Sequence, residues 1–284
     1  MKKNLSTIIL IIIFFIGFFI FFYPAISNYI NSFNQSKVIA EYEEALANLS
    51  KDEHKVLLED AKSYNRELLE KEQKLYNGES KNKEYLSLLN PSHNKVMGYI
   101  TIKKLGVQLP IYHGTEEKLL TVAAGHLEGT SLPVGGKGSH AVITAHRGLP
   151  SAKLFTDLDK MEIGDEFTIT VLKNNLNYQV DSINIVEPNN LELLKISPNE
   201  DYVTLVTCTP YAVNTHRLLV RGTRVESNEQ LRITADAIEI NSFLVAIVIA
   251  IPIVGIFLIL VYLQSKKHKN RKIIEKFGIG KDDE

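Results

Sequence analysis

The sequence predicts a mainly β domain, a barrel or a sandwich, with a helical segment before it and an apolar run near each end of the chain. Between residues 96 and 224, short segments rich in β-branched and aliphatic residues alternate with turns at intervals of about 8–12 residues. Residues 35–76 instead carry apolar side chains four positions apart, as amphipathic helices do. The uncharged runs are long enough to be considered as membrane helices.

Composition limits the classes of function. The chain has 284 residues, which allows one domain of about 130–200 residues with accessory segments. Its formal net charge is −1, so no nucleic-acid partner is expected. It has one cysteine and no Cys/His cluster with the spacing of a zinc site, so we expect no zinc site.

The N-terminal apolar run, Leu5–Phe22, has eighteen residues without a charge and follows Lys2 and Lys3. This is close to the minimum length for a helix that crosses a bilayer. A signal peptide is the competing interpretation, but the run is longer than a usual signal core and no clear small-x-small cleavage site follows it. We therefore expect an uncleaved membrane anchor over residues 1–26.

The second apolar run, Phe243–Leu263, has twenty-one uncharged residues, including Pro252 and Gly255, which membrane helices tolerate. A basic tail over residues 264–284 follows it. The positive-inside rule then places both termini in the cytoplasm and the middle of the chain outside the cell. The alternative, two buried core helices, is poor because each run is apolar on every side.

The region before the β domain, residues 27–84, reads as a helical segment. Val38, Tyr42 and Leu46 are four apart, and Ser50 with Glu53 forms a capping-box pattern, so we expect two helices that separate near residues 49–50. Asn77–Lys83 is a polar loop. The β domain covers residues 85–227, and residues 228–242 link it to the second apolar run.

Seven segments of the β domain have strand character. Pro110 lies inside one of them, which indicates an edge or kinked strand. Glu116–Ala124 is expected to form a short helix, and Gly125–Gly138 a long glycine-rich loop. The expected strands are Val96–Ile102, Val107–Tyr112, His140–His146, Asp165–Val171, Leu176–Val186, Tyr202–Cys208 and His216–Arg224.

The single cysteine, Cys208, is expected where a strand ends, because Pro210 follows closely. One cysteine cannot form an internal disulfide, so its thiol is either buried and inert or exposed and used. A buried core cysteine more often lies in the middle of a strand. The position of Cys208 therefore favours a nucleophile, and a thiol nucleophile needs a proton acceptor or a cation nearby.

Several histidines compete for the role of general acid and base. His146 ends its expected strand beside a loop, as Cys208 does, so two strand ends at one rim would bring the two side chains together. His140 begins the same strand and should lie at the opposite rim, whereas His126 lies in the glycine-rich loop. His146 is the preferred candidate. The other histidines of the domain are His93, His113 and His216.

Arg217 begins the strand that follows Cys208 and lies nine residues after it. A guanidinium stays protonated, so it is no base, but it can hold a substrate carbonyl, stabilise an oxyanion or keep a thiolate charged. The alternative is that Arg217 forms only a structural salt bridge at the surface. Arg221, on the same strand face, is the main rival for the role.

The sequence TLVTC at residues 204–208, with an arginine nine residues after the cysteine and a histidine some sixty residues before it, resembles the signature of the sortases. Longer blocks resemble class C, or pilus-assembling, sortases over most of residues 85–225. They read YLSLLNP, MGYITI, LPIYHGT, GHLEGTSLPVGG, HAVITAHRGLPSAKLFTDLDKM and YVTLVTCTPYAVNTHRLLVRG. The hydrophobic C-terminal run is also similar to class C.

This resemblance implies an eight-stranded β-barrel on a membrane enzyme of Gram-positive bacteria. It implies a cysteine transpeptidase that cuts a Leu-Pro-X-Thr-Gly-type sorting signal between Thr and Gly. Cys208 would form the thioacyl intermediate, His146 would act as general acid and base, and Arg217 would stabilise the substrate and the oxyanion. The acceptor would be a lysine amine of the next pilin subunit, and no cofactor is implied.

One feature departs from the family pattern. Many class C sortases carry an Asp-Pro-aromatic motif in a lid ahead of the YLSLLN block, but Lys74–Glu84 contains neither Asp nor Pro. We therefore expect a weakly held or absent lid. Three other functions stay open from the sequence: attachment of surface proteins to the cell-wall precursor, a simple cysteine peptidase, and a non-catalytic membrane-tethered scaffold.

Overall fold

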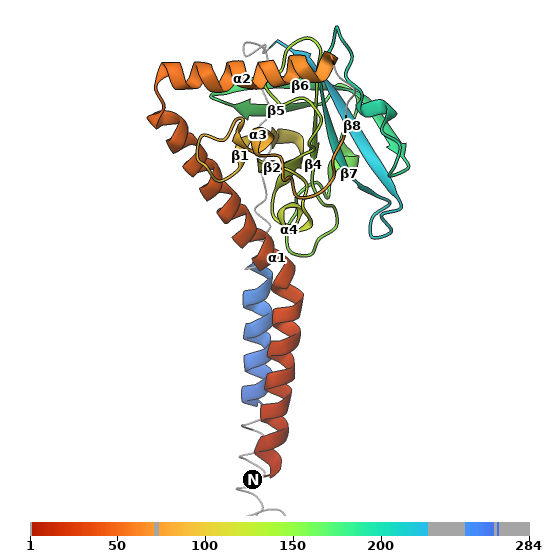
Figure 1. The fold of residues 1–284 in the computed structure, drawn as a ribbon. Helices are drawn as coiled ribbons and strands as arrows, with labels where there is room; N and C mark the ends of the chain where they lie inside the picture. The colour runs from red at the N-terminus through yellow and green to blue at the C-terminus, as the bar shows by residue number, and fades with distance from the viewer. Residues whose placement is uncertain (1, 71–73, 227–247, 264–265, 267–284) are drawn as a thin grey trace, which may run out of the picture. The chain divides into compact units, whose positions relative to one another are not determined.

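The computed structural model describes residues 2–70, 74–226, 248–263 and 266 (Figure 1). The chain divides into two compact units, one of Met1–Ala25 with Asp236–Glu284 and one of Ile26–Ala235. The second unit holds the β-barrel and all the candidate site residues.

The terminal unit contains the start of helix α1 (Lys2–Asn48) and a second helix, Val248–Leu263. By length and composition α1 is apolar enough to cross a membrane, as predicted, whereas the described part of the second run is shorter than such a span. The rings of Phe14 and Phe257 stack with their centroids 3.7 Å apart, so these two apolar segments contact each other. Phe243–Ile247, the linker at 228–242 and all of the 264–284 tail except Lys266 lie outside the described residues.

The predicted break between two helices is confirmed. Helix α2 (Lys51–Glu70) starts directly after α1 ends. The Glu53 amide donates to Ser50 Oγ at 3.2 Å, and the Ser50 amide donates to Glu53 Oε2 at 2.8 Å, which is the reciprocal capping box. Two orphan amides are thereby satisfied, which allows the chain to turn sharply and start a new helix.

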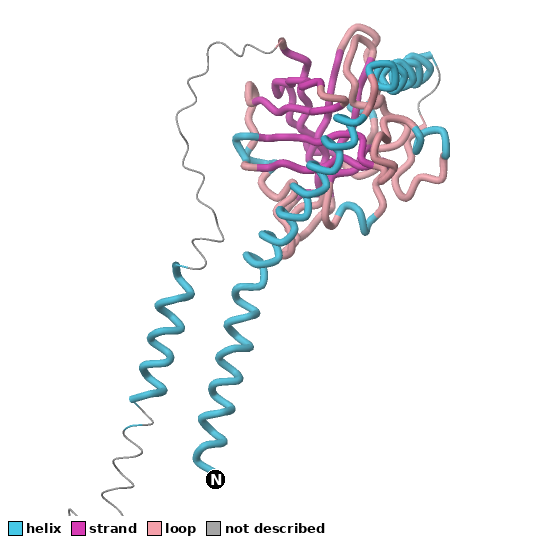
Figure 2. The backbone as a smooth tube through the Cα atoms, turned by 90° about the vertical axis from the view of Figure 1, so that its left-hand side faces the viewer, coloured by secondary structure: helices cyan, strands magenta, loops and turns pink. Residues whose placement is uncertain are grey.

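Both helices are fastened to the barrel by buried polar contacts. The hydroxyl of Tyr42 on α1 donates to the Met97 carbonyl and accepts from the Leu172 amide, each at 3.0 Å. The amide side chain of Asn65 on α2 exchanges two hydrogen bonds with the backbone of Leu132, at 3.0 and 2.7 Å. Figure 2 shows α2 on the outside of the strands.

Eight strands close into a barrel in the order β1-β2-β3-β4-β7-β8-β6-β5, as the family resemblance implied. The β2–β3 and β4–β7 pairs are parallel and the other pairs are antiparallel. The strands are β1 (Val96–Ile102), β2 (Val107–His113), β3 (Ala124–His126), β4 (Ser139–Thr144), β5 (Glu166–Val171), β6 (Asn174–Val186), β7 (Asp201–Thr209) and β8 (His216–Val225). The short helices are α3 (Lys83–Ser87), α4 (Glu117–Leu120) and the 3₁₀ turns at Lys103–Leu105, Leu158–Lys160 and Glu192–Leu194.

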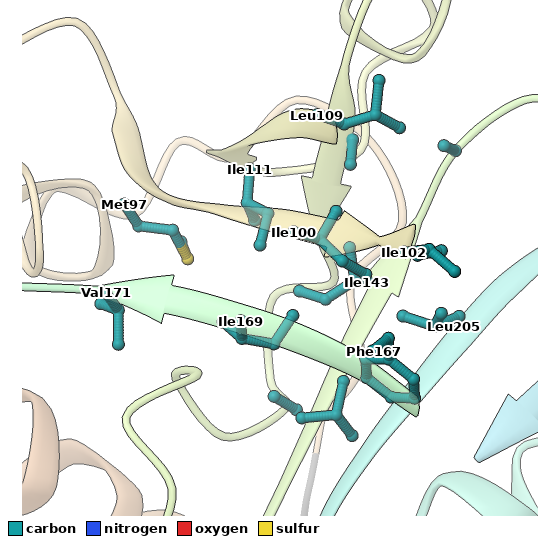
Figure 3. Close-up of a cluster of buried hydrophobic side chains, with 14 of the residues drawn as sticks. Met97, Ile100, Ile102, Leu109, Ile111, Ile143, Phe167, Ile169, Val171 and Leu205 are labelled. Atoms are coloured by element: carbon teal, nitrogen blue, oxygen red, sulfur yellow. The ribbon is translucent and has the colours of Figure 1, made fainter. Parts of the chain in front are cut away.

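The barrel interior is a continuous apolar core. Figure 3 shows apolar side chains from β1, β2, β4, β5 and β7 in this core, with Phe167 close to Leu205. Ile100, Ile143 and Leu205 have no exposed surface. Because successive strand residues alternate between faces, the side chains between these core residues point to the outside of the barrel. The candidate site lies on that outer face.

Three expectations about the elements need correction. β3 was missed because its three residues, Ala-Gly-His, are too short to show alternation, and they lay across the boundary between an expected helix and an expected loop. The expected helix Glu116–Ala124 is only one turn long. β2 has neighbours on both sides, but its ladder to β3 begins only at Ile111, so Pro110 lies before that ladder and its missing N–H is not needed there.

Candidate active site

Cys208 and Arg217 are directly opposite each other in the antiparallel β7–β8 ladder. Thr207 and Thr209 on either side of the cysteine are buried, at 1% and 7% exposure, whereas Cys208 is only half-buried. Strand alternation therefore turns the thiol to the outer face of the barrel, one residue before β7 ends. The sulfur is not sealed in the apolar interior.

His146 follows β4 at the same end of the sheet. The parallel β4–β7 ladder ends with Thr144 opposite Val206. Two further hydrogen bonds continue the pairing, from the Ala145 amide to the Val206 carbonyl at 3.2 Å and from Thr207 Oγ1 to the Ala145 carbonyl at 2.8 Å. His146 and Cys208 each come two residues after the last ladder pair, so adjacent strands bring both to the same level.

The ring of His146 has one hydrogen-bond partner among the described residues. Its Nε2 lies 3.0 Å from Glu117 Oε1 on α4, and its side chain is 21% exposed. A carboxylate only accepts hydrogen bonds, so Nε2 carries the proton in this contact. The Nδ1 atom is then the nitrogen that is available for proton transfer.

The two arginines of β8 have different surroundings. Arg217 Nη1 donates to the carbonyls of Asn214 and His216 at 3.3 and 3.2 Å, and within the described part of the chain no carboxylate pairs with it. Arg221 makes a bidentate salt bridge to Asp181 at 3.0 and 3.1 Å and lies over the Tyr202 ring. Arg221 therefore makes a structural salt bridge, whereas the described hydrogen bonds of Arg217 go to backbone carbonyls and none goes to a carboxylate.

The other candidate histidines have structural surroundings. His126 is fully buried, accepts from the Tyr85 hydroxyl and donates to the Ser131 carbonyl, each at 2.8 Å, and burial lowers its pKa to about 3. The expectation that His126 lies in the glycine-rich loop is wrong, because it is the last residue of β3. Desolvation also lowers the pKa values of His113 and His140, whose ring nitrogens both have partners. His93 and His216 are exposed, and the ring of His216 contacts the Thr215 hydroxyl.

No group of three or more His, Cys, Asp or Glu side chains within the described ranges is arranged to hold a metal ion. The chemistry that these side chains support is acyl transfer through a thiol. Cys208 can supply a nucleophile, His146 can carry a proton, and Arg217 adds a fixed positive charge at adjacent strand ends.

Comparison with known proteins gives the family of this barrel. Residues 100–225 match the family model of the sortase domain. Sortase C1 of Streptococcus agalactiae has 44% sequence identity, and the superposition covers all of that chain and 68% of this one with a TM-score of 0.63. The chain belongs to the sortase family. Sortase C-1 of Streptococcus pneumoniae is similar at 42% identity, 99% of its chain, 67% of this one and a TM-score of 0.59, so this sortase groups with class C.

More distant sortases match about half of this chain. Sortase A of Streptococcus agalactiae is 31% identical over 149 residues, which span 51% of this chain and 59% of the relative's length. Sortase D of Bacillus subtilis is 23% identical over 138 residues, or 48% of this chain and 67% of the relative. These relatives belong to the same family of cysteine transpeptidases.

The segment before α3 is attached to the barrel more firmly than expected. The Tyr76 amide donates to the Glu128 carbonyl at 3.0 Å. The Gly78 amide donates to Thr115 Oγ1 at 2.8 Å, and the Thr115 amide donates to the Gly78 carbonyl at 2.9 Å. Backbone pairing and Thr115 thus attach residues 74–80 to the barrel. The weakly held or absent lid over Cys208 stays a prediction.

An apolar cluster on the outer face lies next to the candidate site. Its buried members are Val142, Leu194 and Leu219, and Val206 is among the partly buried residues packed against them. Val206 and Leu219 come two residues from Cys208 and Arg217 on the same strand faces. Leu75, from the segment before α3, packs against this cluster in the present structure.

Arg147 connects the loop after β4 to the loop after β7. Its side chain is 8% exposed and pairs with Asp159, while Nη1 lies 3.4 Å from Thr209 Oγ1. Its guanidinium lies 5.8 Å from the centroid of the Tyr211 ring, and that ring would contact a Cβ at Gly148 at 3.0 Å. The two loops that leave the site are therefore packed together.

The sequence predicted Cys208, His146 and Arg217, and the structure places them at one end of β4, β7 and β8. Sequence reasoning missed Glu117 and Arg147. The HR pair in the block HAVITAHRGLP is visible in the sequence, but no spacing relates residue 117 to residue 146. Only the packing of α4 beside the end of β4 connects them.

Proposed function

We propose that this sortase is a membrane-anchored transpeptidase that cleaves a Leu-Pro-X-Thr-Gly-like sorting signal and joins pilin subunits through a lysine amine. The observation that carries the proposal is the pairing of Cys208 with Arg217 across β7 and β8, with His146 at the same level of β4. The 40–44% identity to class C sortases over nearly their whole solved chains favours this substrate class.

The reaction has two acyl transfers. The Cys208 sulfur attacks the carbonyl carbon of the scissile Thr–Gly bond, the C–S bond forms, and the C–N bond breaks as the His146 imidazolium protonates the leaving amine. Arg217 stabilises the negative oxygen of the tetrahedral intermediate. A lysine amine then attacks the thioester, gives a proton to the imidazole, and releases the sulfur as the new amide forms.

The apolar terminal helix fits an enzyme that acts at the membrane. Helix α1 anchors the catalytic domain in the proposal, and the second apolar run crosses the membrane near the C-terminus. Both termini are then cytoplasmic and the barrel faces the outside, where pilin subunits with sorting signals are its partners. The low cysteine content is consistent with an extracellular domain.

The test uses cells that carry the full chain or its Cys208→Ala variant. Wild-type cells should show a ladder of high-mass pilin polymers, and mass spectrometry should find an amide between the Thr of a cleaved signal and a pilin lysine. The variant should show neither. In vitro, a sorting-signal peptide should leave a thioester adduct on Cys208. A folded wild-type protein without this adduct would refute the proposal in favour of a scaffold.

The similarity to sortase A of Streptococcus agalactiae favours a second candidate, attachment of surface proteins to the cell-wall precursor. The same cells distinguish the two. A ladder supports polymerisation, whereas a single anchored product that incorporates a wall peptide supports attachment. Release of a free threonine carboxylate as the main product would identify a peptidase, because water would then have resolved the thioester.

A further inference from the structure

We propose that Glu117 is a positioning residue for His146: it holds the ring through Nε2 and leaves Nδ1 as the nitrogen that exchanges protons with the reacting groups. This inference rests on the proposed function. It is carried by the 3.0 Å contact between Glu117 Oε1 and His146 Nε2, which joins residues 29 positions apart in the chain.

Helix α4 (Figure 1), which carries Glu117, is packed closely against β3. Its Leu120 is buried, and a Cβ at Gly125 of β3 would lie 3.0 Å from Leu120 Cδ2 and would clash with the Gly114 carbonyl. Only glycine therefore lets α4 and β3 approach so closely.

Two further connections fix the distance between α4 and His146. Gly125 pairs with Thr144, the last residue of β4, so β3 joins α4 to the strand that carries His146. After α4, the Val122 carbonyl accepts from Gln35 Nε2 of α1 at 2.7 Å. The C-terminal end of α4 is thus held by contacts to β3 and to α1.

The contact determines the tautomer of the ring. The carboxylate can only accept, so Nε2 must be the protonated nitrogen of the neutral ring, and Nδ1 is then its acceptor. When Nδ1 is protonated it can pass this proton to a leaving amine, and when it is not it can accept one from an incoming amine. A ring with the opposite tautomer would present a donor at the time when an acceptor is needed.

The neighbouring charges do not offer an alternative partner for the ring. Arg147 is engaged by Asp159, and Arg217 by loop carbonyls. Glu116 and Lys118 flank Glu117 on α4, and within the described ranges neither forms an ion pair. Glu117 is therefore the carboxylate that orients His146, although its 81% exposure limits the size of the effect well below that of a buried triad aspartate.

The experiment compares Glu117→Ala, Glu117→Gln and the matched control Glu116→Ala in the full chain with a sorting-signal peptide and a lysine-containing acceptor. We expect Glu117→Ala to lower kcat about tenfold with little change in KM, because substrate binding is untouched. Glu117→Gln retains an oxygen that accepts from Nε2 and should keep at least half of the rate. Glu116→Ala should match the wild type.

A spectroscopic readout separates this role from a merely structural one. In protein labelled with ¹⁵N-histidine, the ring correlations of neutral His146 should show the Nε2–H tautomer in the wild type and in Glu117→Gln, and a mixture in Glu117→Ala. An unchanged tautomer in Glu117→Ala, or an equal loss of kcat in Glu116→Ala, would overturn the inference. Failure of the proposed function appears differently, as a wild-type protein with the expected tautomer but no thioacyl adduct.

Discussion

The two ends of the outer face of β4, β7 and β8 carry similar polar residues that differ in how many hydrogen-bond partners they have. At one end, His140 and Arg221 have their polar groups occupied. At the other, His146, Arg217 and Cys208 have few partners. His140 donates from Nδ1 to the Lys195 carbonyl at 2.9 Å and accepts from the Thr204 hydroxyl at Nε2 at 2.7 Å.

Exposure follows the same division. His140 is 1% exposed, whereas the His146 side chain is 21% exposed and has one ring nitrogen bonded to a carboxylate. Arg221 is paired with Asp181, and Arg217 donates only to carbonyls of its own loop. The comparison teaches that the residue type does not assign the role on this face: hydrogen bonds that are already made remove a side chain from chemistry, and unmade ones leave it available.

The largest expected difference is between the alanine variants of His146 and His140, the two histidines at the ends of the β4 region. His146→Ala should lower the rate of thioacyl formation by about 10²–10⁴-fold with little change in thermal stability, because it removes the proton carrier. His140→Ala should instead cost about 1–3 kcal/mol of unfolding free energy, since buried partners lose their hydrogen bonds. Stopped-flow acylation and denaturant unfolding measure the two effects. Equal effects of the two variants on acylation would break the comparison.

The two arginines of β8 provide the next test. Arg217→Ala should reduce kcat by about 10²–10³-fold, as expected when one charge-stabilising donor is removed from an acyl-transfer site. Arg221→Ala should leave kcat within a few-fold and lower stability, because Asp181 loses its bidentate partner. Steady-state kinetics and thermal melts of both variants measure these effects. A larger loss of kcat in Arg221→Ala would assign the stabilisation of the oxyanion to Arg221 instead of Arg217.

The buried histidines make the folding stability of the protein sensitive to acid. The pKa of His126 is lowered to about 3 in the folded state, so between that pH and its ordinary value near 6.5 the unfolded chain binds more protons than the folded one. Stability therefore falls as the pH drops, by about 2 kcal/mol at pH 5 from this residue, and His113 and His140 act in the same direction.

Urea unfolding at pH 7 and pH 5 measures this acid sensitivity. A His126→Gln variant is less stable at pH 7 and should lose less stability on acidification than the wild type. Equal wild-type stability at the two pH values would contradict the assignment of a neutral, buried ring.

The smallest expected effect concerns the segment that rests on the apolar cluster. Leu75→Ala removes a side chain that packs against the apolar cluster next to the candidate site, so a neutral thiol reagent should modify Cys208 a few-fold faster. Tyr76→Ala is the matched control, because the exposed Tyr76 holds the barrel through its backbone amide. If both variants react at the wild-type rate, the segment does not limit access to the open end of the face.

Much of the fold was readable in the chain because its signals are local. Alternation in residues 202–209 gave β7 with Cys208 near its end, and the Ser50–Glu53 capping box gave the break between α1 and α2. β3 was not readable, because three residues of the types Ala, Gly and His carry no period. The firm attachment of residues 74–80 was also missed, since its contacts are backbone pairings to Glu128 and Thr115.

The sequence by itself determined the membrane-type run at the N-terminus, every barrel strand except β3, and the three residue types of the candidate site, because each depends on composition or spacing within a short window. Tertiary structure alone decided that His146 rather than His140 stays accessible, that Arg217 rather than Arg221 is free of a carboxylate, and that Glu117 contacts His146. These depend on strand register and on the packing of α4 against β3, which join residues far apart in the chain and leave no periodic signal in it.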